Sequence, residues 1–120
     1  MINLEHELIN TYTNRQIDEN HQIIEWLVPD RLTYFEGHFP GQPVLPAVAL
    51  IDISEFFIRK TMTANAVLSA VPLAKIKAAI SKNDKVQVSL KKNSNSKEYL
   101  CQWSFFEAPE KIITEIRLIA

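Results

Sequence analysis

The sequence has little of what marks disulfide-stapled or membrane-spanning proteins. Among its 120 residues there is one cysteine, Cys101, so no disulfide can form within the chain. A lone cysteine in a strand-like apolar stretch is typical of a small buried side chain and of a reducing compartment. The longest uninterrupted apolar run, Ala47–Ile51, is far shorter than a membrane span. We therefore expect neither disulfides nor membrane insertion.

An excess of charge of one sign is also missing. Thirteen basic and fourteen acidic residues give a formal net charge of −1, so no basic field covers the molecule and no nucleic acid partner is expected. The first ten residues, MINLEHELIN, lack the apolar stretch of a secretory signal, which favours a cytoplasmic location. The length and the 47% hydrophobic content predict one globular domain over residues 1–120.

Glycine is scarce, and its position is informative. The only two glycines, Gly37 and Gly41, and three of the six prolines lie within Tyr34–Pro46, YFEGHFPGQPVLP. Glycine permits backbone angles that other residues avoid, and proline fixes φ, so this segment concentrates backbone control around His38. A tight structural loop would explain the glycines and prolines. It would not explain a histidine between the two glycines.

Hydrophobic periodicity predicts one apolar helix beside a sheet. Pro46 stands where a helix begins, and the stretch from Ala47 to about Thr63 has no glycine or proline and is apolar on most of its surface. Its polar stripe consists of Asp52, Glu55 and Arg59 at helical spacing.

The remaining periodic segments indicate strands. Residues 1–20 allow a short helix or a first strand, and residues 91–97 form a turn rich in Asn and Ser. Apolar residues on both faces predict that the strand at 99–106 is central. We expect the last four strands to follow one another in hairpins, and the whole to be an α+β domain in which an antiparallel sheet wraps around the helix. The predicted strands are 22–28, 73–80, 84–90, 99–106 and 112–119.

Two side chains are candidates for acid–base chemistry. A histidine has a reference pKa of about 6.5, which suits proton abstraction near neutrality, and His38 is the histidine that glycines and prolines frame. We expect His6 and His21, in polar surroundings, to be solvated. Asp52 lies between isoleucines, where an unpaired carboxylate costs desolvation energy. Alternatively, Asp52 belongs to the solvated stripe of the helix together with its polar neighbours.

The start of the predicted helix is a third candidate. Near Ala47 and Val48 the unpaired N–H groups and the positive end of the helix dipole can stabilise a developing enolate or thioester oxygen. A base, an acid and an oxyanion site are what dehydration of a 3-hydroxyacyl thioester requires. The sequence has no spaced Cys/His cluster, no GxGxxG and no Walker motif, so we expect no metal and no cofactor.

The segment Tyr34–Asp52, YFEGHFPGQPVLPAVALID, resembles the active-site segment of the FabZ/FabA-type 3-hydroxyacyl-acyl carrier protein dehydratases, and most of all their ApeI-like branch, associated with aryl polyene lipids. The motif is GHFPG at 37–41, then Pro43-Val44 and Pro46. The resemblance implies a hot-dog fold, in which the sheet wraps a central helix. It also implies a homodimer with active sites at the interface, and an acyl carrier protein bearing a 3-hydroxyacyl chain as partner in fatty-acid or aryl polyene type lipid synthesis.

The resemblance also implies roles for individual residues. In that family the catalytic histidine lies in this loop and a carboxylate follows fourteen residues later, the spacing of His38 and Asp52 here. His38 of one subunit would then face Asp52 of the partner as the catalytic pair. The substrate-binding positions implied are Phe39, Gly41, Ala47 and Val48.

Two departures from the family pattern keep alternatives open. Ala47 stands where the family usually has glycine, which keeps the N–H but adds a methyl group at a close approach of backbone and substrate. Residues 1–25 lack the family's proline-and-arginine segment. One alternative is a hot-dog acyl-thioesterase, although those enzymes lack this histidine loop. The other is a non-catalytic subunit that binds acyl chains or the carrier protein, for which Ala47 is the main support.

Overall fold

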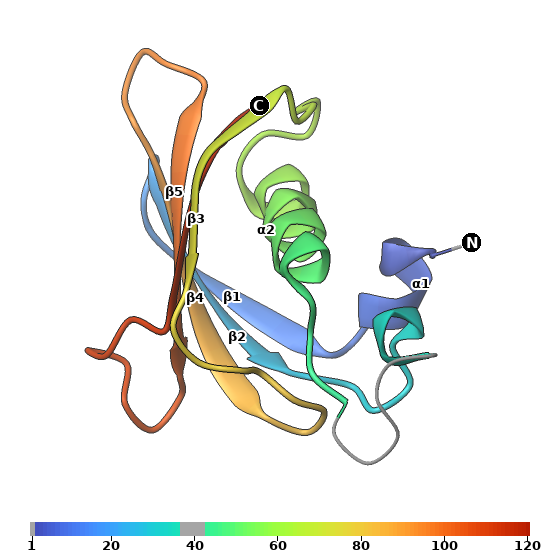
Figure 1. Ribbon diagram of the computed structural model, residues 1–120. Coiled ribbons are helices and arrows are strands. Elements are labelled where there is room, and N and C mark those ends of the chain that lie inside the picture. Colours follow the sequence, from blue (N-terminus) through green and yellow to red (C-terminus); the bar gives the residue numbers. More distant parts are fainter. Residues whose placement is uncertain (1, 37–42) are drawn as a thin grey trace.

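The chain forms a six-stranded antiparallel sheet with one long helix lying across a face of it (Figure 1). The computed structural model describes residues 2–36 and 43–120. Within these ranges no helix is long and apolar enough to cross a membrane. The helices are α1 (Leu4–Leu8), the 3₁₀ turn η1 (Thr33–Phe35) and α2 (Ala47–Thr61). The strands are β1 (Tyr12–Asp18), β2 (His21–Leu27), β3 (Ala70–Ile76), β4 (Lys85–Lys92), β5 (Glu98–Phe105) and β6 (Thr114–Ile119).

The order of the strands is β1-β2-β4-β5-β6-β3. Strand β5 lies between β4 and β6, so its predicted central place is confirmed. The expected hairpin between the first two strands after the helix is wrong, because β3 pairs with β6 and not with β4. Both edges of β4 are taken by β2 and β5, so the chain leaving α2 pairs at the free edge of β6 instead.

The predicted strand at 73–80 is displaced in the structure, where β3 covers residues 70–76. Lys77 N–H still donates to Ile113 O at 2.7 Å, and the chain then leaves the sheet. The register of β3 shifts between Ala70 and Leu73, the interval that contains Pro72. A proline, which has no N–H to donate, is tolerated in such an outer strand.

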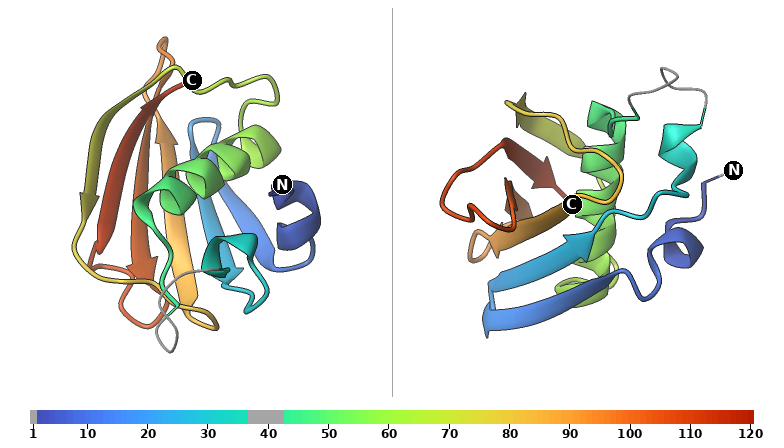
Figure 2. Two further views of the ribbon diagram at one scale, coloured as in Figure 1. Left: turned by 45° about the vertical axis from the view of Figure 1, so that its right-hand side comes forward. Right: turned by 90° about the horizontal axis from the view of Figure 1, so that it is seen from below.

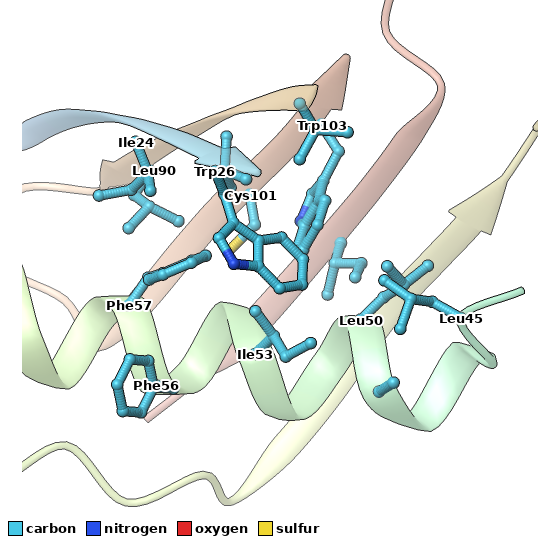
Figure 3. Close-up of a cluster of buried hydrophobic side chains, with 14 of the residues drawn as sticks. Ile24, Trp26, Leu45, Leu50, Ile53, Phe56, Phe57, Leu90, Cys101 and Trp103 are labelled. Atoms are coloured by element: carbon cyan, nitrogen blue, oxygen red, sulfur yellow. The ribbon is translucent and has the colours of Figure 1, made fainter. Parts of the chain in front are cut away.

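The core lies between α2 and the concave face of the sheet. Figure 3 shows Ile53 and Phe57 of α2 directed toward Trp26 of β2 and Trp103 of β5, and all four side chains are fully buried. The ring of Trp26 meets the rings of Phe57 and Trp103 edge-on, with 5.9 Å between centroids in both pairs. Burial of each such large apolar side chain contributes roughly 1.5–3 kcal/mol, so this contact holds the helix on the sheet.

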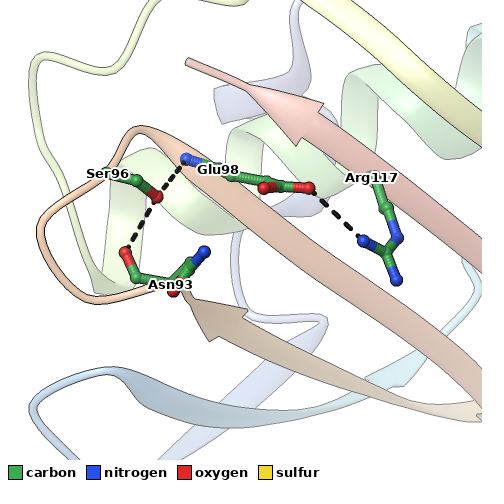
Figure 4. A network of polar contacts seen from close by, with 4 residues as sticks. All are labelled: Asn93, Ser96, Glu98 and Arg117. Carbon is green, nitrogen blue, oxygen red and sulfur yellow. Dashed lines mark hydrogen bonds and ion pairs between the residues drawn. The ribbon is translucent and has the colours of Figure 1, made fainter.

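The turn between β4 and β5 is built by polar side chains, as the sequence predicts (Figure 4). Ser96 Oγ donates to Asn93 O at 3.0 Å and accepts from Glu98 N–H at 3.1 Å. Asn95 adopts φ 61°, a left-handed conformation that asparagine tolerates. Because β4 continues to Lys92, the turn is two residues shorter at its start than the predicted 91–97.

One hydrogen bond in the core gives a test of the packing. Trp103 Nε1–H donates to Ser54 Oγ at 3.0 Å, and both residues are fully buried. We predict that Ser54→Ala lowers the free energy of unfolding by about 1–3 kcal/mol, because the indole N–H is left without an acceptor.

Chemical denaturation measures this loss. Ser94→Ala, at an exposed serine whose Oγ accepts from Asn20 Nδ2, is the control and should change the free energy of unfolding by less than about 0.5 kcal/mol. Equal stability of Ser54→Ala and the native protein would contradict the role given to this bond.

Candidate active site

The segment that leads into α2 is tied to the chain that follows β3. Leu45 N–H donates to Ile80 O at 2.8 Å, and Val44 forms an isolated bridge with Ser81. The first turn of α2 therefore lies toward the β3–β6 side of the sheet, and the helix runs from there toward α1 (Figure 2, left).

The first helical hydrogen bonds of α2 leave two N–H groups ahead of them. Pro46 is the N-cap, and its carbonyl accepts from Ala49 N–H at 3.0 Å and Leu50 N–H at 3.2 Å. Ala47 and Val48 precede these bonds and are both exposed, with Val48 at 57% relative exposure. N–H groups at this position have no intrahelical partner. They can donate to an oxygen atom of a bound ligand.

Asp52 lies one helical turn after Val48 and is half-buried. Its Oδ2 accepts a hydrogen bond from the hydroxyl of Tyr34 in η1 at 2.8 Å. Burial first, and then the hydrogen bond to Asp52, raises the pKa of the Tyr34 phenol, so Tyr34 remains a donor at neutral pH. Asp52 is thus more than part of a solvated stripe, since a buried group from another element holds one of its oxygens.

Glu55 and Arg59, the other members of the polar stripe, have a structural role. Arg59 Nη1 lies 2.8 Å from Glu55 Oε1, the ion pair that the i,i+4 spacing predicts. Glu55 Oε2 also accepts from Leu68 N–H at 2.8 Å. These contacts fasten the loop after α2 to the helix and do not involve Asp52.

The turn that carries Tyr34 is fixed by the N-terminal helix. Glu7 of α1 accepts from the backbone N–H of Thr33 at 2.7 Å with one carboxylate oxygen and from Thr33 Oγ1 at 2.8 Å with the other. Within the turn, Phe35 N–H donates to Leu32 O at 3.0 Å, and Leu32 is buried. The backbone on which Tyr34 stands is therefore held from two sides.

Three of the predicted site residues, His38, Phe39 and Gly41, lie outside the described residues. The other three, Ala47, Val48 and Asp52, lie on the first two turns of α2. The pairing of His38 with Asp52 accordingly stays a prediction.

The other histidines and the cysteine are placed away from Asp52. His6 is exposed on α1, as expected, whereas His21 is half-buried on β2 and its Nε2 lies 2.9 Å from Ser89 Oγ. Burial, followed by the charge of Lys91, lowers the pKa of His21. Cys101 is fully buried in β5, and burial raises the pKa of its thiol to about 12, so it is protonated and unreactive near neutrality.

No metal site lies at Asp52 in the part of the chain that the structure describes. Over residues 2–36 and 43–120, no group of three or more His, Cys, Asp or Glu side chains is arranged to hold a metal ion. A cavity of about 570 Å³ lies at the other end of α2, between Leu4 of α1 and Phe56. Its charged groups are already paired, since Lys60 Nζ lies 2.7 Å from Glu5 Oε1.

Sequence reasoning missed Tyr34 and Glu7. Tyr34 opens the glycine- and proline-rich segment, and a buried tyrosine hydroxyl requires a polar partner, so its type and position were a usable signal. Glu7 carried no such signal, because its contact with Thr33 joins segments 26 residues apart.

Comparison with known protein families identifies the family of this chain. A family model described as ApeI-like, ApeI dehydratase, matches residues 14–117. The chain belongs to the ApeI-like dehydratase family. The match begins within β1, so α1 and its Glu7 precede the matched region. A sequence search of curated proteins gave no match.

Solved structures show that the fold is a hot-dog fold. The dehydratase heterocomplex ApeI:P from Xenorhabdus doucetiae is similar with a TM-score of 0.79 at 17% identity, over 89% of this chain and 92% of that chain. Thioesterase superfamily member 2 from Mus musculus gives 0.68 at 11% identity, over 95% and 84%. The dehydratase domain from the CurF module of curacin polyketide synthase gives 0.65 at 14% identity, over 94% of this chain and 43% of that chain.

The contact between Glu7 and Thr33 can be tested through stability. We predict that Glu7→Ala lowers the free energy of unfolding by about 1.5–3 kcal/mol, because the carboxylate that accepts from Thr33 N–H, Thr33 Oγ1 and Asn3 N–H is lost. Glu5→Ala, on the same short helix, removes an exposed ion pair with Lys60 and should cost less than about 1 kcal/mol.

Thermal or chemical unfolding of the two variants measures both losses of stability. Equal losses would mean that Glu7 acts only through the stability of α1. Faster amide exchange at Thr33 in Glu7→Ala but not in Glu5→Ala is also expected.

Proposed function

We propose that this ApeI-like protein is a (3R)-hydroxyacyl-acyl carrier protein dehydratase, formed by one hot-dog domain over residues 1–120. The observation that carries the proposal is the fixed carboxylate of Asp52, which lies one turn from the exposed helix start and fourteen residues after His38 of the family motif. Family membership supports dehydration as the reaction class. Acyl carrier protein as the carrier, and fatty-acid or aryl polyene type lipid synthesis as the setting, are proposed from the family resemblance.

The chemistry follows from the roles of these groups. His38 removes a proton from C2 of the acyl chain while the N–H groups of Ala47 and Val48 stabilise the negative charge on the thioester oxygen. The C2–C3 double bond forms as the C3–O bond breaks, and protonated Asp52 gives its proton to the departing hydroxyl, which leaves as water. Phe39 and Gly41 are proposed to line the acyl site. No cofactor enters these steps.

A homodimer joined at the β3 edges is part of the proposal. Strand β3 is an outer strand with one edge unpaired within the described chain, and its apolar side chains Val71 and Ile76 are 38% and 43% exposed. The other outer strand, β1, reads YTNRQID and is far more polar. An exposed apolar edge is a template for pairing with another chain. The chain that follows β3 is bound to the start of α2, since Leu45 N–H donates to Ile80 O, and this connection supports active sites shared between two subunits.

Ala47 favours a second candidate, a non-catalytic subunit that binds the acyl chain or its carrier. Its methyl group stands beside the exposed N–H groups where the family usually has glycine, and an ApeI:P pair from Xenorhabdus doucetiae is described as a heterocomplex. A hot-dog acyl-thioesterase remains the third candidate. Its support is the likeness of the fold to a thioesterase superfamily member, which carries no information about the reaction.

Substitution of the catalytic pair tests the dehydratase. We predict that the native protein converts a 3-hydroxyacyl-carrier substrate to the conjugated enoyl thioester. The absorbance of this product measures the rate. His38→Ala and Asp52→Asn should each lower kcat on the order of 100- to 10,000-fold, the usual contribution of a general base or acid. His6→Ala, at an exposed histidine, is the control and should keep the native rate.

The other candidates give different results. Release of free carrier thiol in place of enoyl product would establish the thioesterase. Tight carrier binding without turnover would favour the non-catalytic subunit. If Ala47→Gly then produced turnover, the lack of activity would be assigned to the alanine methyl group. Full activity in both His38→Ala and Asp52→Asn would refute the assignment of the catalytic pair.

A further inference from the structure

Tyr34 is joined to the candidate catalytic acid by a bond that links two elements of the fold. It stands in η1 and is 6% exposed, and its hydroxyl donates to Asp52 Oδ2 at 2.8 Å. The bond joins residues 18 positions apart, across the segment that contains His38. In the part of the chain that the structure describes, no other side chain bonds the Asp52 carboxyl.

The hydrogen bond from Tyr34 gives the two carboxyl oxygens of Asp52 different roles. A phenol that donates to Oδ2 leaves Oδ1 as the oxygen that can carry a proton to a substrate. An aspartate that is half-buried would otherwise rotate about χ2, which is broad for this side chain. Holding one oxygen selects a single orientation for the other.

Tyr34 itself has little freedom to move. Glu7 binds both the N–H and the hydroxyl of the adjacent Thr33, and Glu36 N–H closes the turn on Thr33 O at 3.0 Å. The ring of Tyr34 is buried in the main core cluster. A functional side chain whose supporting residue is locked by packing and hydrogen bonds is pre-organised.

We propose that Tyr34 is the positioning residue of the dehydration acid: its hydroxyl fixes Asp52 Oδ2, so that Oδ1 delivers the proton to the leaving C3 hydroxyl. This inference rests on the proposed function. As the C3–O bond breaks, the Oδ1 proton completes the departing water and leaves Asp52 as a carboxylate. The Tyr34 hydroxyl then donates to that carboxylate and stabilises it. The next cycle begins when His38 has released to solvent the proton taken from C2 and a proton from solvent has returned to Oδ1.

The test is Tyr34→Phe, which removes one oxygen and keeps the ring. We predict a fall in kcat of about 10- to 100-fold, the range expected for the loss of a hydrogen bond to a charged group, with little change in KM. Tyr99→Phe is the matched control, since Tyr99 is also buried and its hydroxyl bonds Thr63 in the loop that follows α2.

A double-mutant cycle separates positioning from a structural role. If Tyr34 acts through Asp52, Tyr34→Phe lowers the rate no further in an Asp52→Asn background. Should Tyr34→Phe fail to fold, 3-fluorotyrosine at position 34 keeps the ring and makes a stronger donor, and it should change kcat in the native background but not in the Asp52→Asn background.

The outcomes distinguish this inference from the proposed function. An inactive native protein refutes the dehydratase. An active native protein with a twofold or smaller effect of Tyr34→Phe, or with additive effects in the cycle, overturns the role of Tyr34 alone. An equal loss in Tyr99→Phe also overturns it.

Discussion

The burial of α2 against one face of the sheet is the contact on which the other features of the fold depend. Ile53 and Phe57 are fully buried against Trp26 and Trp103, and this packing sets the height and direction of the helix over the strands. Because the apolar side of α2 must face the sheet, its opposite side carries the polar stripe with Asp52. The start of α2 is held in addition by Leu45 N–H, which donates to Ile80 O in the chain that follows β3.

The candidate site combines this rigid helix with a second support from the N-terminus. Glu7 accepts hydrogen bonds from Thr33, and Tyr34, the next residue along the chain, donates one to Asp52. These hydrogen bonds and the peptide bond between Thr33 and Tyr34 connect α1 to the carboxyl group. The energy of each bond is modest, but the bonds act in series on one side chain. A carboxyl group that must deliver a proton within hydrogen-bond distance gains more from fixed orientation than from any single contact.

Much of the fold is predictable from local patterns, while the pairing of distant segments is not. The start of α2 at Ala47 follows from Pro46, and the alternation of Val86, Val88 and Leu90 fits a strand with one buried face, as found. The crossing of β3 to β6 depends on which strand edges are free, which no short window of sequence encodes. The predicted hairpin between β3 and β4 was wrong for this reason.

In the candidate site, too, the local features could be predicted from the sequence and the contacts between distant segments could not. The spacing of His38 and Asp52 and the exposed helix start are properties of one segment, and the family resemblance was carried by that segment. The partner of Asp52 within the described chain, Tyr34, lies at the edge of the same segment, but its role depends on how the turn folds back over α2. The contact of Glu7 with Thr33 depends on tertiary structure alone.

The central claim, that each dehydratase site takes His38 from one subunit and Asp52 from its partner, is tested most directly by subunit complementation. His38→Ala and Asp52→Asn proteins, each inactive alone, are unfolded together, refolded as a mixture and assayed for enoyl product. A mixed dimer then contains one site with both residues intact, and random mixing should restore about one quarter of the native rate in a twofold-symmetric dimer. A mixture that exchanges subunits, as mass spectrometry would show, and still has no activity would contradict the shared site.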